Sequence, residues 1–265
     1  MDNNAWEKVE IARDKDRPTA LDYIENIFDD FIELHGDRDF AEDGAIVCGI
    51  ATLNGINYTI IAEQKGRDTK ENIKRNFGMP NPESYKKAIR FMKQSEKFKR
   101  PLITFIDTKG AYPGIEAEER GQGQVIAKSI ETMSSLKIPT ISYVIGEGSS
   151  GGALAIGVAD RVVMLENAIY SILSPEGYAS ILWKDSSRKQ EAAEKMKLTA
   201  HDLLKFNVID EILKEPDGNA KNNVIEMSNI IKEDIIKNIN NLMKLKEKDL
   251  LENRYKKYRK IGGDY

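Results

Sequence analysis

Two apolar runs of strand length, separated by a helical segment, restrict most strongly what this chain can fold into. The runs are PLITFID (101–107) and PTISYVI (139–145), and the stretch between Glu116 and Leu136 has helical spacing. A third run, RVVML (161–165), follows after a second, shorter connection. Parallel strands need a crossover of a dozen or more residues, which the first connection supplies. The sequence therefore predicts an α/β fold with parallel strands.

An antiparallel unit is predicted before these strands. AIVCGIATL (45–53) and INYTIIA (56–62) are rich in β-branched residues and are joined by Asn54-Gly55. This dipeptide between two apolar runs is a strong short-range signal for a tight hairpin. We expect a ββ unit that precedes the first crossover.

Helical patterns flank the strands at both ends of the chain. Pro18 and the apolar spacing that follows predict an amphipathic helix that continues to Gly36. From about Asn222 onward the chain is rich in Lys, Asn and Ile with helical spacing. We expect one domain over 1–265, with an N-terminal helical segment (about 1–36) and a C-terminal one (about 222–265) packed on it.

Charge and cysteine content exclude several classes of protein. The chain has 40 Lys and Arg against 43 Asp and Glu, a net charge of −3, and the single cysteine Cys48. This balance argues against a dedicated nucleic-acid or anionic-membrane binder. One cysteine excludes a disulfide framework and an all-cysteine zinc site within the chain. Without a signal-peptide pattern or a run of about 18 apolar residues, we expect a cytoplasmic protein outside the membrane.

A glycine-rich loop after the second strand matches two known motifs. Residues 146–151 fit G-x-G-x-x-G, but the next helix is short and Glu166 lies too close for a ribose partner about 20 residues away. Residues 148–152 also fit G-x-S-x-G, with Ser150 as nucleophile. A serine hydrolase would need His201, the only later histidine, with an acid such as Asp160 or Asp185. His201 follows the helix cap Thr199 and fits a surface position better.

A third interpretation needs only the main chain. Glycines let a backbone approach a ligand closely, and N–H groups at a helix N-terminus stabilise negative charge on an oxygen. The loop after the first strand, 107–114, is also rich in glycine. Because open α/β sheets bind ligands at the carboxyl ends of their strands, the two loops together predict an oxyanion hole. Simple turns with close packing remain the alternative.

Several long strings resemble the carboxyltransferase α subunits of bacterial acetyl-CoA carboxylase, from about residue 10 to 220. The strings are RPTALDYIENIFDDFIELHGDR (17–38), EQKGRDTKENIKRNFGMPNPESYKKA (63–88), FIDTKGAYPGIEAEERGQG (105–123), VIGEGSSGGALAIGVAD (144–160) and SILSPEGYASILWKD (171–185). The resemblance implies a crotonase-like α/β fold of stacked ββα units with two glycine-built oxyanion holes per catalytic centre. It also implies transfer of a carboxyl group from carboxybiotin to acetyl-CoA, which gives malonyl-CoA for fatty acid biosynthesis.

The same resemblance implies partners and cofactors. The α subunit is expected to pair with a homologous β subunit, in an α2β2 heterotetramer whose active sites lie between the two. Carboxybiotin arrives on the biotin carboxyl carrier protein at the α side, acetyl-CoA binds the β side, and biotin carboxylase belongs to the wider complex. This chain is expected to bind no cofactor or metal itself, and zinc is expected only in the β subunit.

The resemblance assigns roles to residues in both loops. It implies helix N-terminal donors at Gly151, Gly152 and Ala153, and opposing donors at Gly110 and Ala111. Residues implied to shape the loops or contact carboxybiotin are Gly148, Ser149, Ser150, Tyr112 and Gly114. Lys109 and Ser149 depart from the family, which usually has Pro and commonly Gly at these positions, so both loops are reshaped there.

Positive charge gathers between residues 64 and 100, where twelve Lys and Arg face four Asp and Glu. Solvated helix faces are the common explanation for such a cluster. Next to a Gly/Pro-interrupted stretch, however, cations suit CoA phosphates or an acidic partner. The candidates are Lys65, Arg67, Lys74 and Arg75.

Two rival functions stay open from the sequence. A free-standing crotonase-type acyl-CoA hydratase, hydrolase or decarboxylase would need a base near the loops, for which Glu116, Glu118 and Glu147 are candidates. Alternatively, the chain could be a non-catalytic scaffold that binds a partner through its acidic remainder and C-terminal helix.

Overall fold

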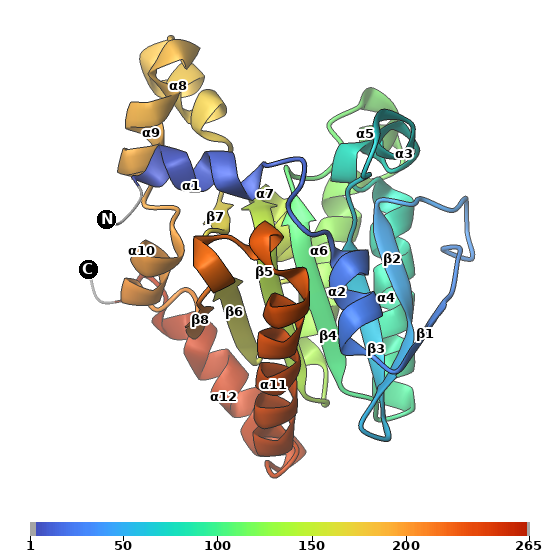
Figure 1. Cartoon of the computed structure of the whole chain (residues 1–265). Coiled ribbons are helices and arrows are strands. Elements are labelled where there is room, and N and C mark those ends of the chain that lie inside the picture. The colour runs from blue at the N-terminus through green and yellow to red at the C-terminus, as the bar shows by residue number, and fades with distance from the viewer. Residues whose placement is uncertain (1–3, 264–265) are drawn as a thin grey trace.

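A mixed sheet forms the centre of the structure, a computed structural model that describes residues 4–263 (Figure 1). Its strands are β1 (Asp30–Glu33), β2 (Ile46–Leu53), β3 (Ile56–Glu63), β4 (Leu102–Thr108), β5 (Thr140–Ser149), β6 (Arg161–Leu165), β7 (Ile169–Ser171) and β8 (Glu211–Leu213). The spatial order is β1-β2-β3-β4-β5-β6-β8, and β7 pairs with the end of β5. The two pairs β1–β2 and β2–β3 are antiparallel, and the others are parallel.

Helices cover both faces of this sheet (Figure 1). The α-helices are α1 (Ala5–Ala12), α2 (Ala20–Ile27), α3 (Thr69–Lys74), α4 (Pro82–Lys97), α5 (Ile115–Glu119), α6 (Gln122–Ser135), α7 (Ser150–Leu154), α8 (Pro175–Trp183), α9 (Lys189–Met196), α10 (Ala200–Lys205), α11 (Val224–Leu242) and α12 (Glu247–Lys260). Short 3-10 turns are η1 (Asn76–Gly78), η2 (Ser186–Arg188), η3 (Pro216–Gly218) and η4 (Ala220–Asn222). Helices α4 and α6 pack together on one face, and α2 packs with α11 on the other. Figure 1 shows α1, α8 and α9 grouped beyond the carboxyl end of β5.

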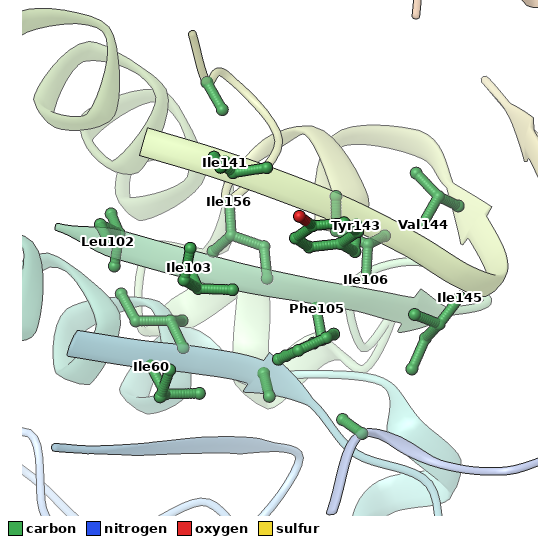
Figure 2. Close-up of a cluster of buried hydrophobic side chains, with 14 of the residues drawn as sticks. Ile60, Leu102, Ile103, Phe105, Ile106, Ile141, Tyr143, Val144, Ile145 and Ile156 are labelled. Atoms are coloured by element: carbon green, nitrogen blue, oxygen red, sulfur yellow. The ribbon is translucent and has the colours of Figure 1, made fainter. Parts of the chain in front are cut away.

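The core lies between these layers, around β3, β4 and β5 (Figure 2). All seven residues of β4 are buried, which is typical of a parallel strand covered on both faces. The rings of Phe105 and Tyr143 stack with their centroids 5.8 Å apart. These contacts hold β4 and β5 in place. The two segments predicted to form the oxyanion hole follow these strands directly: residues 109–114 after β4 and 150–153 after β5, together the donor loops.

The hairpin prediction is confirmed, and the N-terminal helix prediction is wrong in its extent. Asn54 and Gly55 both have positive φ, as a tight hairpin turn requires, and join β2 to β3. The predicted helix ends at Ile27, because β1 pairs with β2 and Asp29 N donates to Thr52 O (2.8 Å). The apolar spacing between Ile27 and Gly36 fits a strand as well as a helix, and here it forms β1.

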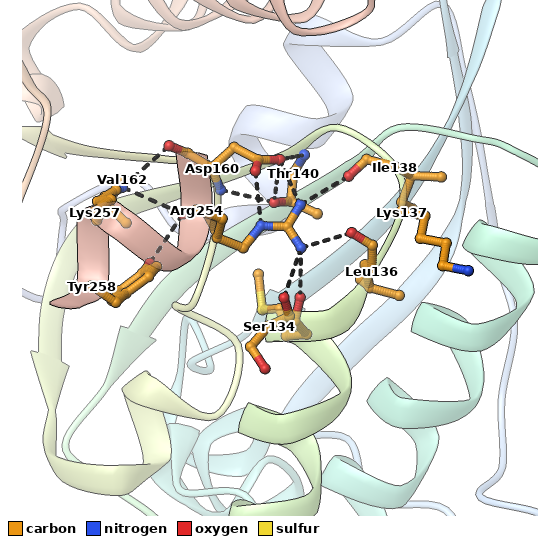
Figure 3. A network of polar contacts seen from close by, with 12 residues as sticks. Ser134, Leu136, Lys137, Ile138, Thr140, Asp160, Val162, Arg254, Lys257 and Tyr258 are labelled. Carbon is orange, nitrogen blue, oxygen red and sulfur yellow. Dashed lines mark hydrogen bonds and ion pairs between the residues drawn. The ribbon is translucent and has the colours of Figure 1, made fainter. Parts of the chain in front are cut away.

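The C-terminal segment is helical as predicted, divided into α11 and α12. A buried arginine on α12 fastens it to the sheet (Figure 3). Arg254 pairs with both carboxylate oxygens of Asp160 (2.8 Å each) and donates to Leu136 O (2.7 Å) at the end of α6. Asp160 also accepts from Thr140 N (2.8 Å), the first residue of β5. One side chain therefore joins α12, α6 and β5 at the end of the sheet opposite the donor loops.

Candidate functional site

The carboxyl ends of β4 and β5 bring the two predicted loops together. β5 runs four residues past its predicted end, to Ser149, and α7 begins at the next residue. A Cβ placed on Gly152 would lie 2.5 Å from Ala111 N and 2.7 Å from Gly110 C, closer than real side chains come. The backbones of the two loops are therefore in contact, and only glycine fits at position 152.

The glycines of the G-x-G-x-x-G match have packing roles. Gly146 and Gly148 lie within β5, and α7 has only five residues. A Cβ on Gly146 would overlap the Asp107 carboxylate, and one on Gly148 would lie 2.9 Å from the Tyr170 ring. Neither glycine opens a long helix, as the dinucleotide motif requires.

Main-chain donors are present at the start of α7. The first N–H groups of a helix have no acceptor within it. Among residues 4–263, the N–H groups of Gly151 and Gly152 have no hydrogen-bond acceptor, and Ala153 follows them, buried, in the same helix. Gly151 is partly exposed, and Ser150 before it is exposed, with φ of 60°. This helix N-terminus can accept a negatively charged oxygen from outside.

The opposing loop offers one donor where the sequence predicted two. Gly110 N–H donates to Thr108 Oγ1 (3.0 Å), and that hydroxyl donates to Gly78 O (2.6 Å). The prediction that Gly110 supplies a free donor is therefore wrong in this conformation, because its N–H already donates to the Thr108 hydroxyl. Ala111 N–H has no acceptor within residues 4–263 and remains the candidate on this side.

Hydrogen bonds to neighbouring segments hold the rest of this loop. Tyr112 N donates to Pro80 O (3.0 Å), and Gln122 Nε2 donates to Tyr112 O (3.0 Å). Gly114 lies on the Tyr112 ring, where a Cβ would overlap it, and precedes α5. The predicted helix 116–136 is broken at Gly121 (φ 85°), so it forms two helices, α5 and α6.

The structure does not assemble a serine-hydrolase triad. His201 is exposed on α10, and Asp185 is exposed and accepts from Ser187 N (3.0 Å). Asp160 pairs with Arg254 and accepts from Thr140 N at the start of β5, whereas Ser150 follows the last residue of that strand. A strand of this length spans about 30 Å. The structure thus disfavours the hydrolase interpretation of the loop.

The structure also places the three glutamates that were candidate bases for a free-standing acyl-CoA enzyme. Glu147 is buried and receives both Nε (3.0 Å) and Nη2 (2.7 Å) of Arg13, which also binds Glu176 (3.0 Å). Such a bidentate pair fixes the orientation of the carboxylate. Glu116 and Glu118 are exposed on α5. Within residues 4–263, none of the three side chains forms a hydrogen bond with Gly151, Gly152 or Ala111.

A groove of about 590 Å³ opens beside the α7 donors. Ser150 and Gly151 form its edge, and apolar side chains from β7, α8, α9 and α10 form most of its walls. The exposed Lys195 and Lys197 add positive charge. Sequence reasoning missed this groove because its walls come from segments that only the fold brings together.

Two of the four predicted cations line a second cavity. Lys65 and Arg67 lie in a cavity of about 220 Å³ with Lys109, which follows β4. Lys65 pairs with Asp107, and Arg67 pairs with Asp22 (2.5 Å).

The other two predicted cations lie outside it. Lys74 is exposed, and Arg75 pairs with Glu71 (2.8 Å). Residues 4–263 hold no cluster of three His, Cys, Asp or Glu that could bind a metal, and none of their helices could cross a membrane.

Comparison with known proteins gives consistent relatives over nearly the whole chain. A family model described as acetyl co-enzyme A carboxylase carboxyltransferase-like matches residues 2–262. The carboxyl transferase subunit alpha of Clostridium acetobutylicum is 60% identical over 97% of this chain and 94% of its own length. A Clostridium tetani protein named for subunits beta/alpha is 60% identical over 98% of this chain, which spans 45% of that relative.

Solved structures agree on the fold. Transcarboxylase 12S matches 87% of this chain and 44% of its own with a TM-score of 0.66 and 20% identity. The beta subunit of Pseudomonas aeruginosa geranyl-CoA carboxylase matches 86% and 45% with a TM-score of 0.62 and 18% identity. The fold is crotonase-like, as the resemblance implied. The chain belongs to the acetyl co-enzyme A carboxylase carboxyltransferase-like family.

Proposed function

We propose that the chain is the α half of a carboxyltransferase that moves a carboxyl group from carboxybiotin to acetyl-CoA and so forms malonyl-CoA. The single observation that carries this proposal is the contact between two donor loops at Gly152 and Ala111. Family membership and relatives named as subunit alpha support the choice of substrates. Fatty acid biosynthesis is the proposed use of the product.

The donor loops would stabilise the charge that this reaction creates. When the carboxyl carbon leaves the biotin nitrogen as carbon dioxide, the bonding electrons pass to the ureido group and its oxygen becomes negative. Ala111 N–H on one side, with the N–H groups of Gly151, Gly152 or Ala153 on the other, would donate to that oxygen. Removing one such donor typically costs about 2.7 to 4 kcal/mol of transition-state stabilisation. The biotin nitrogen can then take the acetyl-CoA α-proton, and the resulting carbanion attacks carbon dioxide.

The groove beside α7 suits the ring system of biotin. Its walls include Tyr170, Tyr178 and Leu203, and apolar walls with a few polar groups are typical of small-molecule sites. Ser150 and Gly151 lie at its edge, next to the proposed donors. Gly148, Ser149 and Ser150 would then shape the entrance. Ser149 Oγ is buried without a partner within residues 4–263.

We propose a phosphate of CoA as the occupant of the smaller cavity lined by Lys65, Arg67 and Lys109. Lys109 is exposed there, and the cavity lies next to the β4 loop. An acidic surface of a partner is the alternative for the same cations. Lys74 and Arg75 lie outside this cavity, and their contact with CoA or with a partner stays a prediction.

A β subunit is the proposed partner. Relatives named for subunits beta/alpha unite both names in one chain, which supports the pairing. The α2β2 assembly, the biotin carboxyl carrier protein, biotin carboxylase and a zinc site confined to the β subunit remain proposals that follow from the resemblance. A cytoplasmic location also remains a proposal, consistent with one buried, unpaired cysteine.

Co-purification followed by an activity assay tests this function. The tagged chain, expressed in its own host, should capture a carboxyltransferase β subunit rich in cysteine. The captured complex should transfer the carboxyl group of malonyl-CoA to free biotin, whereas the chain alone should not. Turnover by the isolated chain would contradict the shared site, and a captured complex without any transfer would contradict the proposed reaction.

A further inference from the structure

We infer that Asp107 is a positioning residue for both donor loops, because its carboxylate holds a bulge in β5. This inference rests on the proposed carboxyl transfer and adds a residue that acts on the reaction through the donor loops, although Asp107 also lines the cavity proposed for a CoA phosphate. Sequence reasoning passed over Asp107, although it is the last residue of the PLITFID run and the only charged one in it.

The pairing of β4 and β5 changes register beside Asp107. Ile106 pairs with Val144, but Thr108 pairs with Gly148. Two steps along β4 therefore correspond to four steps along β5. Extra residues that leave a ladder bend the strand and redirect the chain beyond it, and such bulges occur often beside active sites. Here the bulge directly precedes both donor loops.

The Asp107 carboxylate occupies the space inside this bulge. Its Oδ1 accepts from Glu147 N (2.9 Å) and pairs with the Lys65 ammonium. Gly146 leaves room for it, because a Cβ there would overlap the same oxygen. Asp107 is 5% exposed, so these contacts replace most of its contact with water. A buried carboxyl group needs polar partners, which the Glu147 N–H and the Lys65 ammonium supply here.

The same residue is connected to both loops at short range. Asp107 lies four residues before Ala111, and the Glu147 N–H that it binds lies five residues before Gly152. Asp107 N–H in turn donates to Glu63 Oε2 (3.1 Å) at the end of β3. Displacing the carboxylate would therefore shift the α7 donors relative to Ala111, and about 1 Å of displacement is enough to cost about a hundredfold in rate.

Asp160 supplies a matched control at the opposite end of β5 (Figure 3). Its side chain is 4% exposed, accepts from Thr140 N (2.8 Å) and pairs with Arg254. Asp107 and Asp160 thus both accept from a β5 amide and pair with a cation. Only Asp107 adjoins the donor loops, so their Asn variants separate positioning from general stability.

The test uses the complex with its β subunit, malonyl-CoA and free biotin. Asp107→Asn should lower kcat at least tenfold, and this loss should exceed the change in the KM for malonyl-CoA, because Asp107 also pairs with Lys65 in the cavity proposed for a CoA phosphate. Asp160→Asn should lower the melting temperature at least as much and leave kcat unchanged. Gly146→Ala places a methyl group where the Asp107 carboxylate lies and should reproduce the kcat loss. This variant replaces Asp107→Asn in the test if the Asp107→Asn chain does not form a complex with the β subunit.

The outcomes separate this inference from the function on which it rests. If the wild-type complex transfers no carboxyl group, the proposed function fails. If it does, and both Asp107→Asn and Gly146→Ala keep the wild-type kcat, the positioning role is wrong while the function stands. A kcat loss in Asp160→Asn equal to that in Asp107→Asn would also overturn the inference.

Discussion

Replacing Gly152 with alanine should abolish most of the turnover while leaving the fold intact. The added Cβ would lie 2.5 Å from Ala111 N and 2.7 Å from Gly110 C, both main-chain atoms that cannot rotate away. Ordinary contacts of this kind begin near 3.4 Å, so the loops must separate by about 0.9 Å. A misplacement of about 1 Å costs about a hundredfold in rate, equal to about 2.7 kcal/mol of activation free energy.

Carboxyl transfer from malonyl-CoA to biotin, measured on the complex with the β subunit, provides the assay. Gly152→Ala should reduce kcat about a hundredfold while size-exclusion chromatography still shows the complex. Gly123→Ala is the matched control, because Gly123 lies within α6 and its Cβ would meet nothing within 4 Å. That variant should keep its kcat and gain about 0.5 to 1 kcal/mol of stability.

A Gly152→Ala complex with kcat within about threefold of wild type would contradict this prediction. It would mean that the loops need not approach so closely and that their amides do not share one oxygen. A complex that fails to assemble would point instead to a structural role for the contact. The scaffold interpretation predicts unchanged cellular function for bulky replacements at position 152, whereas the transferase interpretation predicts its loss.

Four further predictions concern residues around the sheet. Arg254→Ala removes six hydrogen bonds and leaves Asp160 buried without its cation, so urea denaturation should show a loss of about 3 to 5 kcal/mol. Burial and, after it, the charge of Asp107 raise the pKa of Glu63 well above its ordinary value. The neutral form of Glu63 therefore stabilises the fold fully below about pH 4.3, and this stabilisation is lost as pH rises from there to the raised pKa. Glu63→Gln, which cannot ionise, should show a smaller fall in the free energy of unfolding over the same pH range in urea denaturation. Ser150→Gly relieves a positive φ and should raise stability by about 1 kcal/mol with carboxyl transfer retained, whereas loss of all turnover would revive the serine nucleophile. Glu116→Gln should leave kcat within about threefold, and a loss of more than about a thousandfold would favour the acyl-CoA rival.

The central strands could be predicted because their apolar runs are nearly continuous. β4 is buried on both faces, and its residues are apolar except for Thr104, Asp107 and Thr108. The hairpin was predictable from one dipeptide, Asn54-Gly55. β1 could not be predicted, because its pairing with β2 depends on a partner about 20 residues away and its apolar spacing also fits a helix. The extension of β5 through Gly146 was hidden for a similar reason, since glycines indicate loops when the carboxylate that they accommodate lies elsewhere in the sequence.

The candidate site could likewise be predicted only in part. That the loops after β4 and β5 meet followed from the rule that parallel strands end at one edge of a sheet. That Gly110 N–H is taken by Thr108 depends on a side-chain rotamer that no spacing pattern contains. The groove and the Arg13–Glu147 pair join α1, β5 and α8, which are far apart in sequence. Such contacts become visible only once the fold is known.

The most direct test of the account is a crystal structure of the complex of this chain with its β subunit and bound biotin. The ureido oxygen is expected about 2.7 to 3.1 Å from Ala111 N and from one amide nitrogen among Gly151, Gly152 and Ala153. An oxygen bound to side chains alone, or placed on the far side of the groove from α7, would contradict the claim that these main-chain amides carry the reaction.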